Sequence, residues 1–139
     1  ELEKFSPNTT IIQHACPMWV PLIESNQHET AIGKKLIEND VNELLGMSSA
    51  IDTIILACTH YPLIINHVRE IVGEKIQVVS QGPIVAKKLR EYLQRNEFME
   101  TQLSTGGSCS FLTTEKAAVF NIAANQFLKQ AVTAVQIRL

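Results

Sequence analysis

The sequence predicts an α/β fold in which short apolar strands alternate with amphipathic helices and pair as a parallel sheet. Two observations lead to this prediction. Residues 53–57 form a short, continuous apolar run, which is typical of a strand buried on both faces. Residues 28–46 instead place their apolar side chains at helical spacing, on one stripe that ends near Gly46. The same alternation continues to the end of the chain, as expected for βαβ units.

The other elements follow the same signals. Further strands are expected at residues 9–14, 76–80, 109–112 and 135–139. Further helices are expected at residues 62–72 and 83–93, each opening with a proline, and in a last segment that Thr114 could cap. Polar residues 96–108 are expected to form a loop or crossover. The faces expected to point inward in the last two helices are Val85, Ala86, Leu89, Tyr92 and Leu93, and Phe120, Ala124, Phe127 and Leu128.

Composition excludes several classes of protein. The chain has 139 residues, enough for a domain of the usual ~100–150, and a net charge of −2 with no basic stripe, so no nucleic-acid partner is expected. Its apolar runs fall short of the roughly 18 residues that a membrane span needs. Three cysteines, an odd number in no disulfide spacing, indicate free thiols and a cytoplasmic location. Because the sequence begins at Glu1 rather than at Met, we expect upstream residues to be missing.

The segment with the strongest chemical signal follows the strand expected at 53–57. Cys58, Thr59 and His60 lie between that strand and the helix opening at Pro62, where ligands bind in open α/β sheets. A helix N-terminus favours the thiolate form of a nearby cysteine, and its free N–H groups can bind an anion such as a substrate carboxylate. His60 could hydrogen-bond the thiol or accept a proton. On this local pattern alone, a cysteine such as Cys58 is more often a small core residue than a catalytic one.

Three segments resemble bacterial glutamate racemases. Residues 54–63 (Ile-Ile-Leu-Ala-Cys-Thr-His-Tyr-Pro-Leu) resemble that family's second cysteine motif, an apolar strand followed by Gly-Cys-Thr-His-Tyr-Pro. Residues 15–24 (Ala-Cys-Pro-Met-Trp-Val-Pro-Leu-Ile-Glu) resemble its Cys-Pro-x-x-Val-Pro-Leu-x-Glu segment, in the right order upstream. Residues 111–114 more weakly resemble the strand before the family's last helix. The resemblance covers nearly the whole chain.

The resemblance implies a cofactor-independent enzyme that converts L-glutamate to D-glutamate for peptidoglycan, with two thiols facing opposite sides of the substrate α-carbon. It implies that Cys58 is the second of these thiols, that His60 assists it, that Glu24 lies near that histidine, and that Thr59 binds the substrate. It implies no metal and no pyridoxal phosphate. A homodimer is one possible assembly.

The resemblance also implies a division of the chain. Residues 1–82 would be part of the second racemase domain, and residues 83–139 would return to complete the first. The motif bearing the family's first thiol does not occur in this sequence, and Cys16 and Cys109 are interpreted as structural. We therefore expect this chain to be inactive alone.

Two departures and two alternatives remain. Ala57 stands where the family has Gly, and residues 80–82 (Ser-Gln-Gly) stand where it commonly has Asp-Ser-Gly.

One alternative is a racemase of another acid in the aspartate/glutamate racemase superfamily. The other is a metal-binding module, because two pairs of residues supply the ligand types of a structural zinc site, although the single-residue spacers are unlike the usual ones. These ligands would be His14, Cys16, Cys58 and His60.

Overall fold

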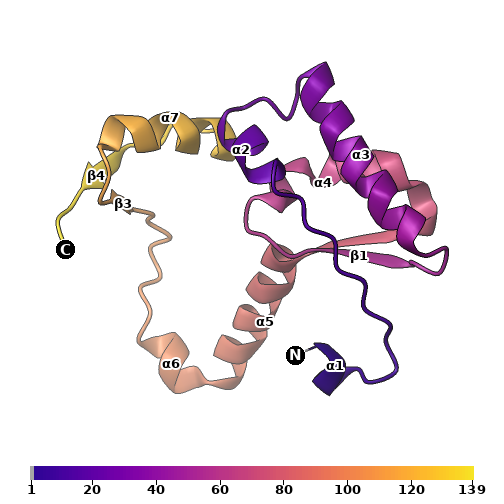
Figure 1. Ribbon diagram of the computed structural model, residues 1–139. Helices are drawn as coiled ribbons and strands as arrows, with labels where there is room; N and C mark the ends of the chain where they lie inside the picture. Colours follow the sequence, from indigo (N-terminus) through magenta and orange to yellow (C-terminus); the bar gives the residue numbers. More distant parts are fainter. Residues whose placement is uncertain (1) are drawn as a thin grey trace. The chain divides into compact units, whose positions relative to one another are not determined.

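The computed structural model describes residues 2–139, with side-chain detail from Lys4 onward, and confirms the α/β class (Figure 1). The chain divides into two compact units between Pro83 and Ile84. This boundary lies one residue from the one expected at 82/83. The assignment of each part to a racemase domain stays a prediction.

The first unit is built on a parallel βαβ motif. Strand β1 (Thr53–Leu56) pairs with β2 (Gln77–Ser80) in parallel, with Thr53 opposite Gln77. The connection runs through the 3-10 turn η1 (Tyr61–Ile64), helix α4 (Ile65–Val72) and a second 3-10 turn, η2 (Gly73–Lys75). Parallel strands require such a crossover. The carboxyl end of β1 therefore leads directly into the segment that carries Cys58.

Only one face of β1 is buried. Ile54 and Leu56 are buried, whereas Ile55 between them is 48% exposed. The expectation that both faces of this strand are buried is therefore wrong for this chain. Side chains alternate across a strand, and an apolar run does not by itself supply the second layer that would cover the other face.

Helix α3 (Ala31–Met47) packs against α4 and contributes Ile37 and Val41 to this unit's core. Thr30 caps α3, because its Oγ1 accepts a hydrogen bond from the N–H of Gly33 at 3.1 Å. The side chains with the least exposure come from three helices, and each contributes roughly 1.5–3 kcal/mol by leaving water. They are Ile23, Ile37 and Val68.

The segment before α3 differs from the sequence prediction. Residues 9–14 form no strand, because a strand needs a partner for its backbone groups and β-branched composition alone does not provide one. Residues 19–24 instead form a short helix, α2 (Trp19–Glu24), which was not predicted. Pro21 fits there because the N–H groups of a first helical turn have no intrahelical partner.

The second unit contains another parallel pair. Helix α5 (Gln81–Arg95) crosses the unit boundary and is followed by α6 (Glu97–Thr101), which lies in the stretch expected to be a loop. Strand β3 (Phe111–Thr113) then pairs with β4 (Ala134–Gln136) across α7 (Ala117–Leu128).

Two asparagines of α7 hold the chain that leads into β4. Asn121 Oδ1 accepts from the N–H of Ala134 at 2.9 Å, and Asn125 Oδ1 accepts from the N–H of Val132 at 2.5 Å. The expected cap by Thr114 is wrong, since Lys116 is the N-cap of α7. Thr113 Oγ1, not Thr114, accepts the nearby N–H of Glu115.

The apolar face expected to point inward in α5 is largely exposed, and that of α7 is only half-buried. Val85 is 62% exposed, and Leu89, Tyr92 and Leu128 are also exposed. Helical periodicity shows that a helix has an apolar face, but burial requires a packed neighbour, which the periodicity does not provide. Among the described residues, no helix is long and apolar enough to cross a membrane.

Candidate active site

Cys58 lies just beyond the carboxyl end of β1, in a segment of residues 58–61 that we call the cysteine loop. The N–H of Tyr61 donates to the carbonyl oxygen of Cys58 at 3.2 Å, and the N–H of Leu63 donates to the carbonyl oxygen of His60 at 3.0 Å. These turns bend the chain sharply from strand into η1. The thiol of Cys58 is half-buried and Thr59 beside it is exposed, so a ligand can reach both.

Three predicted residues come together in a series of contacts. Cys58 Sγ lies 3.9 Å from His60 Nδ1, and His60 Nε2 lies 3.1 Å from Glu24 Oε1. When Nε2 carries the proton it donates to Glu24, and Nδ1 then faces the thiol as an acceptor. The carboxylate therefore orients the imidazole, and the imidazole can take or return the proton of the thiol.

Glu24 reaches the site from the last position of α2. Its side chain is 61% exposed and that of His60 is 32% exposed, so solvent screens their attraction. The contact therefore contributes little to stability, and its chemical value is the orientation of the histidine ring. Thr59 has no role assigned by this geometry beyond its place beside Cys58.

A second layer of side chains lies behind the cysteine loop and was not predicted. The Tyr61 hydroxyl donates to the carbonyl oxygen of Cys16 at 3.2 Å. The ring of Trp19 meets that of Tyr61 edge-on, with centroids 4.8 Å apart and planes at 61°. Trp19 Nε1 in turn donates to Asp40 Oδ2 at 2.6 Å. Trp19 and Asp40 are 21 positions apart, and no local pattern in the sequence joins them.

Burial and negative charge alter the ionisation of this layer. Burial, and then Asp40 and Glu43, raise the pKa of Cys16 from 9.0 to about 11. Burial, and then the neighbouring Cys16 and Cys58, raise the pKa of Tyr61 above its usual range. Both groups are therefore neutral near pH 7. Cys16 lacks the thiolate character that a base requires.

The ligand set of the metal-binding alternative is not assembled. Among the described residues, the group that could hold a metal ion is His14, Asp40 and Glu43, with ligand atoms within 4.8 Å of one another. That group includes neither Cys58 nor His60; His60 instead contacts Cys58 and Glu24.

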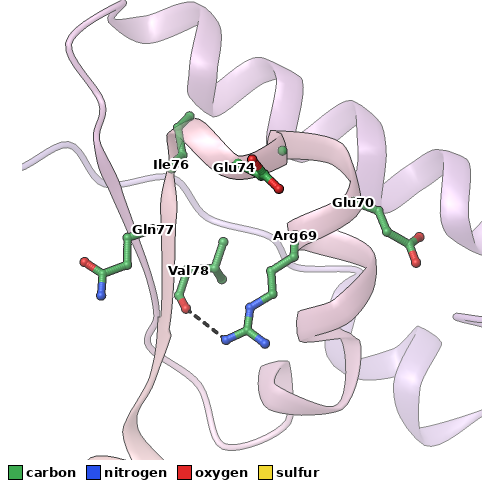
Figure 2. Close-up of a pocket in the computed structure, with 7 residues that line it drawn as sticks. Arg69, Glu70, Glu74, Ile76, Gln77 and Val78 are labelled. Carbon is green, nitrogen blue, oxygen red and sulfur yellow. Dashed lines mark hydrogen bonds between the residues drawn. The ribbon is translucent and has the colours of Figure 1, made fainter.

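A surface hollow of about 590 Å³ lies at the amino end of β2, at the opposite edge of the sheet from Cys58 (Figure 2). It is bordered by the end of α4 and the start of β2, where Arg69 Nη2 donates to the carbonyl of Val78 at 3.4 Å. Ligands of parallel sheets bind at the carboxyl ends of the strands, and this hollow lies at the amino end. It contains none of the predicted site residues.

The chain is similar in sequence to known proteins. No protein-family model matches the chain. It is 30% identical to the glutamate racemase of Streptococcus agalactiae serotype Ia over 139 residues, covering all of this chain and 52% of that protein. It is 33% identical to the glutamate racemase of Lysinibacillus sphaericus over 129 residues, covering 93% of this chain and 48% of that protein.

Solved structures give the same result. Glutamate racemase isoform RacE1 from Bacillus anthracis matches with a TM-score of 0.83 and 25% identity, over 99% of this chain and 50% of that one. The glutamate racemase from Francisella tularensis, solved in complex with D-glutamate, matches in fold with a TM-score of 0.77 and 23% identity, over the same shares of the two chains.

The sequence similarity and the α/β fold thus make the chain a homologue of enzymes of the racemase class. More particularly, the chain is homologous over its whole length to glutamate racemases. It spans about half the length of the relatives that it matches.

Proposed function

We propose that this chain supplies one of the two thiols of a cofactor-independent glutamate racemase. The observation that carries the proposal is the series Glu24–His60–Cys58, with its contacts of 3.1 Å and 3.9 Å. Glu24 orients the imidazole of His60, and that imidazole lies beside the thiol, where it can accept and return a proton. The similarity to glutamate racemases supports glutamate as the substrate. The D-glutamate formed would enter peptidoglycan synthesis in the cytoplasm.

The proposed reaction removes a proton from one face of the α-carbon and adds a proton to the opposite face. The thiolate of Cys58 removes the α-proton of L-glutamate, and the electron pair stays on the α-carbon beside the carboxylate. A second thiol on the opposite face gives its proton to that carbon, which yields D-glutamate. No electron is gained or lost, and reversal of the two roles runs the reaction backwards. Thr59, exposed next to Cys58, would bind polar groups of the substrate.

The second thiol is proposed to lie in a part of the enzyme that this chain does not contain. Cys16 stays protonated because its pKa is about 11, and Cys109 lies exposed in the second unit. The relatives are about twice as long as the chain. Residues 1–82 would belong to one racemase domain and residues 83–139 to the other, so the 139-residue chain alone would not racemise glutamate.

The test is racemisation of L-glutamate by the full-length enzyme that contains this chain, with no pyridoxal phosphate or metal added. Circular dichroism follows the loss of optical activity, and NMR in D₂O follows exchange of the α-proton. We expect Cys58→Ala to lower kcat by about 10²–10⁴-fold, the usual contribution of a general acid or base. Cys109→Ala is the matched control, and its activity should equal that of the wild type.

Two results would contradict the proposal. Racemisation that survives Cys58→Ala would remove this thiol from the mechanism. A wild-type enzyme with no activity on glutamate, but with activity on aspartate or another acid, would move the substrate to the wider superfamily. Steady turnover by the isolated 139-residue chain would contradict the proposed need for a second part.

A further inference from the structure

Helix α2 contacts the cysteine loop at both of its ends. At its first residue, Trp19, the indole meets the ring of Tyr61 with centroids 4.8 Å apart. At its last residue, Glu24, the carboxylate meets His60 at 3.1 Å. Since Tyr61 directly follows His60, both contacts are made to neighbouring residues of one loop. The placement of α2 therefore affects both contacts.

Asp40 fixes the orientation of the first of these contacts. Its Oδ2 accepts the indole N–H of Trp19 at 2.6 Å, a short hydrogen bond. Trp19 is only 4% exposed, so water does not readily replace this acceptor. Asp40 itself lies on α3, the longest helix of the unit, whose Ile37 and Val41 are in the core. A rigid element thus holds the indole.

We propose that Asp40 and Trp19 are positioning residues for the proton transfer at Cys58, because together they fix α2 and the cysteine loop so that Glu24 meets His60. This inference rests on the proposed racemase function. Neither residue contacts the thiol in this structure, and neither is given a chemical step. Their effect passes through Tyr61 on one side and through Glu24 on the other.

The two residues respond differently to substitution. Asp40→Leu removes the acceptor and leaves a buried indole N–H without a partner, which is the costly case for a hydrogen bond. Trp19→Phe removes the donor but keeps a ring against Tyr61, and the Asp40 side chain, 26% exposed, can turn to water. Asp40→Asn keeps an oxygen that can accept from the indole. The structure therefore predicts that Asp40→Leu disturbs the site most, Trp19→Phe less, and Asp40→Asn least.

The experiment measures kcat and KM for L-glutamate in the full-length enzyme carrying each variant. We expect Asp40→Leu to lower kcat by about 10–100-fold with KM little changed, because small displacements of a proton-transfer group have effects of this size. Asp40→Asn should restore kcat to within about threefold of wild type, and Trp19→Phe should fall between. The double variant Trp19→Phe/Asp40→Leu should be no slower than Asp40→Leu alone, since both act on one hydrogen bond. Asn42→Leu, at an exposed position of the same helix, is the control.

Two outcomes would overturn the inference: Asp40→Asn as slow as Asp40→Leu, or a double variant whose loss is the product of the two single losses. If Asp40→Leu does not fold, as its melting curve would show, Asp40→Asn and Trp19→Phe decide, with the kcat of Trp19→Phe expected below that of Asp40→Asn. A wild-type enzyme that does not racemise glutamate contradicts the proposed function separately. The rate of Cys58 alkylation in the same variants then tests the positioning, and equal rates in wild type and Asp40→Leu would overturn it.

Discussion

Glu24 Oε1 lies 3.1 Å from His60 Nε2, although 36 positions separate the two residues in the chain. The contact joins the end of α2 to the cysteine loop and completes the series that ends at Cys58. Both partners are open to solvent, and such pairs contribute little to folding. Activity should therefore depend on this contact far more than stability does.

Replacing the carboxylate tests this directly. We expect Glu24→Gln to lower kcat by about tenfold, because a neutral amide orients an imidazole and supports its positive charge less well than a carboxylate. The melting temperature should stay within about 2 °C of wild type. Glu29→Gln is the matched control: Glu29 is equally exposed and pairs with Lys34 at 3.2 Å, away from the thiol. Equal kcat losses in the two variants would contradict the assigned role of Glu24.

The start of α3 depends on a glycine for steric reasons. A Cβ on Gly33 would lie 2.0 Å from the carbonyl oxygen of Gln27, which accepts hydrogen bonds from the N–H and the hydroxyl of Thr30. We expect Gly33→Ala to lower the free energy of unfolding by about 1–3 kcal/mol. Urea denaturation of Gly33→Ala and of the wild type measures this difference in the free energy of unfolding.

Gly46, near the other end of the same helix, is the matched control for Gly33. Nothing lies within 4 Å of a Cβ built there. Gly46→Ala should therefore raise the free energy of unfolding by about 0.5–1 kcal/mol, the usual gain from alanine inside a helix. Stabilisation by both alanines would show that Gln27 is not placed as described.

Alkaline pH should destabilise the first unit through Cys16. Its pKa is about 11 in the folded chain and 9.0 ordinarily, so between these values the unfolded chain has lost a proton that the folded chain keeps. Stability is therefore full below about pH 9 and falls as the pH rises towards 11. Urea unfolding at pH 8 and pH 10.5 measures this loss, and Cys16→Ala should make it smaller. An unchanged loss would contradict the raised pKa.

The three thiols should differ in their reaction with iodoacetamide. At pH 8 only about one Cys16 in a thousand is thiolate when its pKa is about 11, so Cys16 should react slowest. Cys109 is exposed and serves as the internal reference. Glutamate should slow alkylation of Cys58 and leave that of Cys109 unchanged, as mass spectrometry of the labelled peptides would show. Protection of Cys109 instead would contradict a substrate site at Cys58.

Much of the fold was predictable from local signals. The helices around residues 28–46 and 62–72 and the strands around 53–57 and 76–80 follow from periodicity and from signals such as Pro62 and Gly46. The predictions failed where a segment's state depends on what lies beside it. Residues 9–14 have strand composition but no strand partner, and Val85 and Leu89 lie on an apolar face that stays exposed.

The sequence by itself determined the α/β class and the thiol in its strand-to-helix turn, because strand, turn and helix signals act between near neighbours. The approach of Asp40 to Trp19 was decided only by the tertiary structure, and that of Glu24 to His60 was expected only through the family resemblance, not from the residues themselves. Each of these pairs joins separate elements, and packing α2 and α3 around the βαβ unit sets their distances. No local pattern records where a helix will lie once its apolar side chains are buried.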